Sequence, residues 1–269
     1  MGEARILVTG ASGTIGRTIR TGMAGRPLRL LDVVPPAPPE PGEDVETVTA
    51  TVTDLDAMTE ASRGAAAIVH LGGIATEGPW ADVLDVNIDG TRAVLEAARL
   101  AGVPRVVLAS SNHAAGFRTR AEGDPLPADV RPRPDTYYGV AKVAMEGLGS
   151  LYHDRFGMDV VCLRIGTMRE APADARALAT WLSPGDVTRL VEASLAAPSP
   201  GFRIVWGISR NTRRWWSLAE GEEIGYHPED DAEEFAAEII AENGEPDTAA
   251  DIHFRVGGGY TTLPLGTPD

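Results

Sequence analysis

The chain has 269 residues, of which 43% are hydrophobic and 23% charged, and a formal net charge of −15. This composition is typical of a globular domain with a substantial core, and no apolar run approaches the ~20 residues of a membrane helix. The negative charge makes nucleic acid and anionic membranes poor partners. The single Cys162 excludes an internal disulfide, and the N-terminus shows no signal-peptide pattern. We therefore expect a cytoplasmic protein.

The first 165 residues alternate between strand-like and helix-like patterns, as expected for a parallel sheet built from βαβ units. A proline-rich connection at 33–44 separates the second and third strands. The predicted strands, the later four of them buried, are 5–10, 26–32, 45–52, 65–71, 104–111 and 159–165. The predicted helices are 13–25, 80–102, the clearest amphipathic one, and 137–156.

After Arg164 the pattern loosens into a helix at 183–196, a strand at 203–209, short acidic helices and a glycine-rich tail. Residues 217–251 carry thirteen acidic and no basic side chains, which predicts a solvated acidic surface. The whole pattern predicts an α/β fold, a Rossmann-type doubly wound parallel sheet with a small C-terminal substrate-binding region. Residues 1–269 form one domain, with the core at 1–165 and the smaller region at 166–269, whose strand near 203–207 returns to the sheet.

A glycine-rich turn follows the first strand, with Gly10, Gly13 and Gly16 in the segment GASGTIG. Such a turn before a helix lets backbone amides approach a pyrophosphate. Asp32 lies 22 residues after Gly10, at the end of the second strand, where a carboxylate accepts ribose hydroxyls and repels the phosphate of NADP. We therefore expect NAD. The alternative is that these glycines only punctuate a helix start. Asp54 fits an adenine contact or a simple helix cap.

Tyr138 and Lys142 are four residues apart on a predicted helix and share one face. Lys142 is the only lysine beside 23 arginines. An ammonium near a phenol favours the phenolate, so we expect Lys142 to lower the pKa of Tyr138 and make it a base toward an alcohol. The alternative is a chance spacing on an ordinary helix.

The segments GASGTIG, HLGG, NIDGT, the Ser110–Ser111 pair and YYGVAK together resemble the extended short-chain dehydrogenase/reductase superfamily, in its NAD-dependent epimerase/dehydratase branch. The resemblance implies a catalytic trio of Ser111, Tyr138 and Lys142, with Asn87 near the cofactor path. The residues that we assign to NAD are Gly10, Ser12, Gly13, Thr14, Ile15, Gly16, Asp32, Asp54, Leu55, Leu71, Gly72, Gly73, Asn87, Tyr138, Lys142 and Ile165.

Polar side chains follow the fifth predicted strand, at Ser111, Asn112 and His113. Because ligands of open α/β sheets bind at the carboxyl ends of the strands, three hydrogen-bonding groups there suit a polyol. Loop capping is the alternative for Asn112 and His113. No spacing of His, Cys or acidic residues suggests a metal.

Further segments resemble the uronate dehydrogenases, a group within the same superfamily: SSNHAAG, HLGGIATEGPW, RIGTMREAPADARALATW, VWGIS and FRVGGGY. The resemblance implies that Arg176 clamps a sugar carboxylate and that Tyr260 flanks the ring. A surface ion pair is the alternative for Arg176. Ala75 stands where that group has a serine, and Thr76 follows it. The implied substrate contacts are Ala75, Ser111, Asn112, His113, Tyr138, Arg176 and Tyr260.

The implied reaction is NAD-dependent oxidation of the anomeric C1 hydroxyl of glucuronate or galacturonate to the aldarolactone. Tyr138 would remove the hydroxyl proton while Ser111 holds the same oxygen. One alternative is a nucleotide-sugar epimerase or dehydratase, which needs a nucleoside diphosphate pocket that the short acidic C-terminal part does not favour. Another is a non-catalytic NAD-binding protein. The superfamily resemblance also implies a homo-oligomer.

Overall fold

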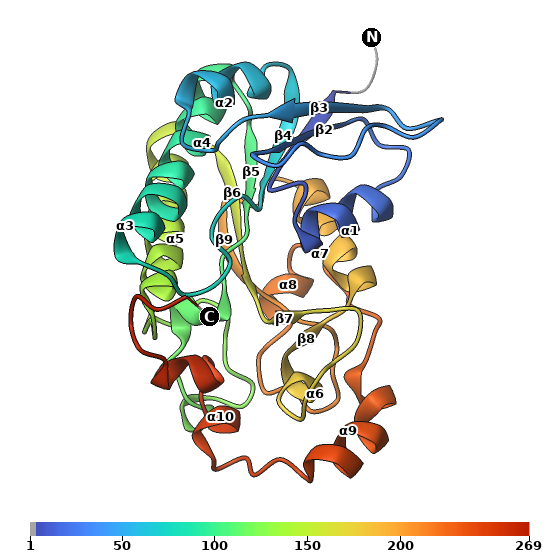
Figure 1. The fold of residues 1–269 in the computed structure, drawn as a ribbon, viewed down its shortest axis with the longest axis vertical. Coiled ribbons are helices and arrows are strands. Elements are labelled where there is room, and N and C mark those ends of the chain that lie inside the picture. Colours follow the sequence, from blue (N-terminus) through green and yellow to red (C-terminus); the bar gives the residue numbers. More distant parts are fainter. Residues whose placement is uncertain (1–3, 269) are drawn as a thin grey trace.

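The computed structural model describes residues 4–268 and is built around a seven-stranded parallel sheet (Figure 1). The strand order is β3-β2-β1-β4-β5-β6-β9. The chain adds β2 and β3 on one side of β1 and the later strands on the other, so the topological switch point lies between β1 and β4. Its strands are β1 (Arg5–Thr9), β2 (Leu28–Asp32), β3 (Val45–Thr49), β4 (Ala65–His70), β5 (Arg105–Leu108), β6 (Asp159–Ile165) and β9 (Phe202–Gly207). The returning strand near 203–207 is thus confirmed, at the sheet edge beside β6.

Helices cover both faces of the sheet, which confirms the doubly wound fold (Figure 1). One face carries α2 (Leu55–Ser62), α4 (Gly90–Ala101) and α5 (Tyr137–Phe156), and the other carries α1 (Thr14–Gly22) and α7 (Pro184–Ala196). The remaining helices are short: α3 (Trp80–Asp82), α6 (Ala177–Thr180), α8 (Ala219–Glu222), α9 (Ala236–Asn243) and α10 (Asp251–Phe254).

The central strands are buried on both faces, as their valine-rich sequences predict. In β5 and β6, Val106, Val107, Val160 and Val161 are completely buried. The prediction that 45–52 forms a buried strand is wrong, because β3 lies at the edge of the sheet and its residues are half-buried or exposed. Its sequence VETVT places Glu46, Thr47 and Thr49 in exposed positions, which an edge strand allows.

The predicted helix 80–102 is not uniform. A π-helical segment at Val83–Asp89 separates α3 from α4. Asn87 lies in this segment, and its amide accepts from Ile74 N (2.7 Å) and donates to Ile74 O (2.9 Å). Such wide turns often occur at functional sites, and this one aims the Asn87 side chain at the loop after β4.

Apart from α7 and β9, the region after 166 lies at the carboxyl ends of the strands (Figure 1). It contains a two-stranded sheet, β7 (Thr167–Met168) with β8 (Trp181–Leu182). Several carboxylates of the acidic segment 217–251 are paired rather than simply solvated. Glu233 and Glu245 bind Arg213, and Glu229 binds Arg189. The single-domain reading with a division near 166 stays a prediction.

Exposed apolar side chains gather on the outer helices, at Leu100 of α4 and at Val140, Leu151 and Phe156 of α5. The predicted homo-oligomer stays a prediction. Within residues 4–268, no helix combines the length and apolar character needed to cross a bilayer.

Candidate active site

The glycine turn after β1 packs too tightly for side chains. A Cβ at Gly10, where φ is +68°, would lie 2.7 Å from Gly72 N, and one at Gly16 would lie 2.5 Å from Gly10 O. Gly13 precedes α1, and no side chain from the described part of the chain caps this helix start. The amides of the first turn of α1 are therefore available to a phosphate, as a dinucleotide site requires.

The Asp32 carboxylate stands at the carboxyl end of β2 beside this turn. Its Oδ2 accepts the Ser12 N–H (2.9 Å) and its Oδ1 accepts the Val34 N–H (3.2 Å). Each carboxylate oxygen has two lone pairs, so both retain capacity for a ribose hydroxyl. The arrangement fits NAD, and the adenosine-side role of Asp32 stays a prediction.

A buried hydrogen-bond network supports the loop at Gly72, and the sequence pattern did not reveal it. Thr9 Oγ1 lies 2.8 Å from His70 Nδ1 and accepts from Gly72 N (3.2 Å), while His70 Nε2 lies 3.3 Å from Thr91 Oγ1. Burial lowers the pKa of His70 to about 3, with a smaller effect of Lys142 in the same direction. His70 is therefore neutral, and its ring serves to connect Thr9 with Thr91.

Asp54 acts as the N-cap of α2, since its Oδ1 accepts the Ala57 N–H at 3.0 Å. This is the capping alternative considered for Asp54, and an adenine contact stays a prediction. Ile165, at the end of β6, pairs with Ser111 in a parallel bridge, which puts it beside one of the three predicted catalytic residues.

Tyr138 and Lys142 lie in the first turns of α5, which begins after the N-cap Thr136. Lys142 Nζ donates to Ala109 O (2.6 Å) and lies 5.2 Å from the centroid of the Tyr138 ring. Both residues are buried. The arrangement places a phenol and an ammonium on one helix face, as the spacing predicts.

The expected lowering of the Tyr138 pKa is not found in the chain by itself. Burial raises the pKa of Tyr138 to about 12, a hydrogen bond from Ser111 pulls it down, and Asp135 raises it. Burial also lowers the pKa of Lys142 to about 8, against the opposing effect of Glu146. The expectation is wrong here because the loss of hydration at the phenol dominates, and Lys142 is not among the groups that shift this pKa.

Beneath the lysine lies a buried ion pair that local sequence patterns do not show. Arg164 Nε and Nη2 donate to the two oxygens of Glu146, both at 2.8 Å, and Ser110 Oγ donates to Glu146 Oε1 (2.7 Å). Arg164 Nη1 also donates to Ala128 O (2.8 Å). Because the other residues of β6 after Asp159 are apolar (VVCL before Arg164 and Ile165 after it), the sequence suggested only a buried strand.

Ser111, Asn112 and His113 form the turn after β5. Ser111 Oγ accepts from His113 N and donates to Asn112 Oδ1, both at 3.3 Å. Asn112 Nδ2 donates to Val256 O (2.9 Å), so Asn112 connects this turn to the C-terminal segment. This contact with a backbone carbonyl corresponds to the capping alternative considered for Asn112. The His113 ring stacks on Tyr260 with centroids 4.2 Å apart. The fold thus brings these predicted substrate residues together.

Arg176 reaches the same C-terminal segment. Its Nη1 donates to Ile252 O (3.2 Å) and Arg255 O (3.4 Å), and its Nη2 donates to Val256 O (2.5 Å). Arg176 forms no salt bridge with another described residue, so the surface ion-pair alternative is wrong. Burial lowers the pKa of Arg176 to about 10. Three donors are used, and the Nε–H with one Nη2–H remains.

The loop after β4 contains a buried carboxylate that sequence reasoning missed. Ala75 is exposed, and Thr76 turns its Oγ1 toward Glu77 O (3.4 Å). Glu77 is 1% exposed; its Oε2 accepts the Tyr138 N–H (2.9 Å) and its Oε1 the Gly266 N–H (2.8 Å). The motif TEGPW gave no signal for this role, because both partners are backbone amides far along the chain.

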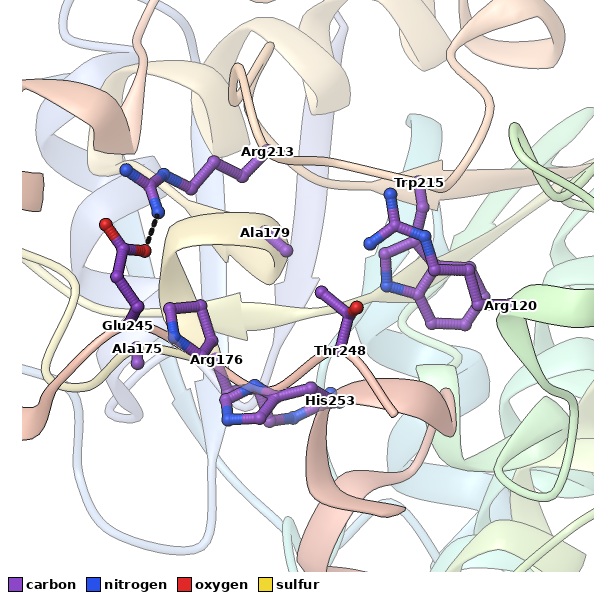
Figure 2. A pocket seen from close by; sticks show the side chains of 10 residues that line it. Arg120, Ala175, Arg176, Ala179, Arg213, Trp215, Glu245, Thr248 and His253 are labelled. Carbon is purple, nitrogen blue, oxygen red and sulfur yellow. Dashed lines mark hydrogen bonds and ion pairs between the residues drawn. The ribbon is translucent and has the colours of Figure 1, made fainter. Parts of the chain in front are cut away.

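Arg176 also lines a cavity of about 310 Å³ (Figure 2). Ser111, Tyr138 and Lys142 are not among its lining residues. Arg213 points to Glu245 across it, and Arg120 is paired with Asp124, so their charges are compensated. Its lining residues are Arg120, Ala175, Arg176, Ala179, Arg213, Trp215, Glu245, Pro246, Thr248 and His253.

Comparisons with known proteins agree with this site. The NAD dependent epimerase/dehydratase family matches residues 6–183. A uronate dehydrogenase from Agrobacterium fabrum is 42% identical over 262 residues, covering 97% of this chain and 98% of the relative. An NAD-dependent glucose-6-phosphate dehydrogenase from Haloferax volcanii is 38% identical, covering 90% of this chain and 97% of the relative.

Among solved structures, a mutant of uronate dehydrogenase from Agrobacterium tumefaciens complexed with NAD superposes with a TM-score of 0.90. It is 38% identical and covers 97% of this chain and 98% of its own. The predictions of NAD as cofactor and of an oxidoreductase that acts on a CH–OH group are confirmed. The chain belongs to the NAD-dependent epimerase/dehydratase family.

Proposed function

We propose that the protein oxidises the anomeric C1 hydroxyl of a hexuronic acid, glucuronate or galacturonate, to the aldarolactone. The observation that carries this proposal is Arg176, a half-buried guanidinium that forms no salt bridge with another described residue. Arg176 donates to the Val256 carbonyl, which also accepts a hydrogen bond from the Asn112 amide. A uronate carboxylate supplies the missing negative charge.

The proton chemistry is assigned to Tyr138 and Ser111. Ser111 holds the reacting oxygen through its hydroxyl, and Tyr138, as phenolate, takes the proton from that oxygen. A pKa of about 12 leaves little phenolate at neutral pH in the free chain, so the base must gain from positive charge that arrives with the ligands. Lys142 Nζ lies 5.2 Å from the centroid of the Tyr138 ring, and its positive charge also favours the phenolate.

The residues around Gly10 and Asp32 hold the cofactor. The amides at the start of α1 bind its pyrophosphate, and Asp32 accepts hydrogen bonds from a ribose. Lys142 uses one of its three N–H donors on Ala109 O and has two left for the second ribose. Bound NAD supplies the hydride acceptor for C1. The protein supplies orientation and excludes water from the buried tyrosine.

Arg176 meets the carboxylate with the edge that its backbone contacts leave open. The Nε–H and one Nη2–H remain as donors, and a guanidinium can offer such a pair to the two oxygens of a carboxylate. Gly258, at a φ of +57°, permits this arrangement, since a Cβ there would lie 2.6 Å from Arg176 Nε. The three carbonyl contacts fix the guanidinium before the substrate arrives.

A second candidate is oxidation of a neutral or phosphorylated aldose at the same carbon. It rests on Ala75, which removes the hydroxyl expected at this position of the loop, and on relatives named glucose-6-phosphate dehydrogenase and L-arabinose 1-dehydrogenase. In this case the Arg176 guanidinium serves only to bind the C-terminal carbonyls. The two candidates differ in whether the substrate needs a carboxylate.

The test is NADH formation by the purified protein with NAD and, in parallel, glucuronate, galacturonate, glucose, galactose, arabinose and glucose 6-phosphate. We expect turnover of the uronates, and a rise in KM of about 100-fold in Arg176→Lys, because lysine cannot form the bidentate contact. Arg92→Lys, in an exposed ion pair with Asp89, is the matched control. Turnover of the neutral or phosphorylated sugars alone contradicts the proposal.

Tyr138→Phe separates catalysis from binding. We expect a loss in kcat of roughly 100-fold or more, since general base catalysis contributes that much, with NAD binding retained. Fluorescence titration with NADH measures the binding. A Tyr138→Phe variant with near-normal kcat rejects the assigned base.

A further inference from the structure

The Asp135 carboxylate is buried where three segments of the chain meet. Its side chain has 0% exposure. A Cβ at Gly116 would lie 2.1 Å from Asp135 Oδ2, and a Cβ at Gly257 would lie 1.8 Å from the same atom. The turn after β5 and the C-terminal segment both come this close only because they carry glycine there. The fold therefore builds a tight niche around one carboxylate, directly before the catalytic helix.

The hydrogen bonds in this niche fix the positions of two protons. The Gly139 N–H donates to Thr136 Oγ1 (3.0 Å), and the Thr136 hydroxyl donates to Asp135 Oδ1 (3.1 Å). His113 Nδ1 lies 2.8 Å from Asp135 Oδ2. An ionised carboxylate only accepts hydrogen bonds, so the proton in this last contact belongs to His113 Nδ1.

The other nitrogen of the His113 ring faces no described partner. The ring stacks on Tyr260 and meets Tyr138 edge-on, with centroids 5.8 Å apart. This differs from His70, whose two nitrogens both contact threonine hydroxyls. His113 Nε2 is therefore the nitrogen that remains for a ligand, and the side chain is 14% exposed.

We propose that Asp135 is a positioning residue that holds His113 in its Nδ1–H tautomer, so that Nε2 accepts a hydrogen bond from a sugar hydroxyl. The sugar part of this inference rests on the proposed function. Neutral imidazole has one donor and one acceptor nitrogen, and the partner of one nitrogen decides the role of the other. The dyad thus selects substrates that present a hydroxyl donor beside the reacting carbon.

Asp135→Asn tests this directly because its amide is not symmetric. The Thr136 hydroxyl keeps its acceptor only if the amide oxygen takes the place of Oδ1. The NH2 group then faces His113 Nδ1, which must accept, and the ring changes to the Nε2–H tautomer. The same substitution in a catalytic Asp–His pair traps the wrong tautomer in serine proteases. Asp135→Asn with Thr136→Val frees the amide to turn and restores the original tautomer.

The first experiment reads the tautomer in the resting protein, by long-range 1H–15N correlation on 15N-histidine at roughly pH 8, where an ordinary imidazole is neutral. The protein has five histidines, and the His113 signals are those lost in His113→Gln. We expect an Nδ1–H ring. An Nε2–H ring, or one with both nitrogens protonated, overturns the proposal. This spectrum needs no active substrate and no variant of Asp135, so it does not depend on the proposed function.

The second experiment measures kinetics with the sugar that the wild-type protein oxidises. We expect Asp135→Asn to raise the KM of the sugar about tenfold, as for a lost hydrogen bond, with kcat and the KM of NAD within about threefold. The double variant should recover most of this loss. Asp89→Asn, which removes an exposed carboxylate paired with Arg92, is the matched control. An unchanged sugar KM in Asp135→Asn, or equal losses in the single and double variants, overturns the proposal.

Discussion

Glu146 and Arg164 form a completely enclosed ion pair one turn of α5 beyond Lys142, with both hydrogen bonds at 2.8 Å. Arg164 is 0% exposed and Glu146 4%. The pair joins α5 to β6, and the Glu146 charge raises the pKa of Lys142 against the effect of burial. A structural contact and the charge of Lys142 are thus linked through one carboxylate.

Arg164→Met should be destabilising by about 3–5 kcal/mol, because it leaves Glu146 buried without its partner. Glu146→Met with Arg164→Met should recover most of that loss, since no unpaired charge remains. Urea unfolding of the wild type, the single variants Arg164→Met and Glu146→Met, and the double variant measures the cycle. We expect the double variant to fold well and still to lose activity, because Lys142 then lacks the nearby carboxylate. Purely additive losses would argue against a coupled pair.

Glu77 joins the start of α5 to the C-terminal tail, so Glu77→Gln should loosen the tail. An amide has one acceptor oxygen for two backbone N–H groups, and one of them loses a charge-assisted hydrogen bond of about 1.5–3 kcal/mol. We expect faster hydrogen exchange in residues 255–266 and a sugar KM raised about tenfold, because this segment carries Tyr260. Glu60→Gln, an exposed residue paired with Arg63, is the control. Exchange identical to that of the wild type contradicts this role.

Asp32 should decide the choice between the two nicotinamide cofactors. Asp32→Ser removes the charge that opposes the 2′-phosphate of NADP and keeps an acceptor for the Ser12 amide. We expect the ratio of kcat/KM for NAD to that for NADP to fall about 100-fold or more. The variant loses the contact of the carboxylate with the ribose of NAD, and it no longer repels the 2′-phosphate of NADP. Asp56→Ser, at the exposed start of α2, is the control. An unchanged ratio places cofactor selection elsewhere.

The fold and the cofactor turn were predictable because their signals are local. Valine-rich strands, the glycine spacing and the YxxxK pair each lie within one element, and the parallel sheet follows from their alternation. The supporting contacts were not predictable. Asp135 with His113, Glu77 with Gly266 and Glu146 with Arg164 are contacts between separate elements, and only the packed fold brings them together.

Two errors have a common physical cause. The segment at 45–52 has the same strand pattern as its neighbours, but its place at the sheet edge exposes it. The pKa of Tyr138 was expected to fall from the presence of Lys142, but burial of both groups reverses the direction. In each case the residues were identified correctly, and the degree of burial, which depends on the whole fold, decided the outcome.

His70 should make the folded state sensitive to acid. Its folded pKa is about 3, against an ordinary value of 6.5, because burial disfavours the charged ring. As the pH falls through 6.5, the unfolded chain binds a proton at His70 that the folded chain does not, so the free energy of unfolding falls. The penalty grows until the pH reaches the folded pKa, and at pH 4 it amounts to about 3 kcal/mol.

Urea unfolding between roughly pH 7 and pH 4 measures this effect in the wild type and in His70→Asn, which cannot take up a proton in this range. Many carboxylates also titrate in acid, and they are common to both proteins, so the difference in slope isolates His70. His153→Asn, a half-buried histidine that contacts only a backbone carbonyl, is the control. We expect His70→Asn to be less stable at pH 7, where it loses the contacts with Thr9 and Thr91, and to lose less stability on acidification. Parallel pH profiles for His70→Asn and the wild type would show that the His70 ring takes up its proton without unfolding.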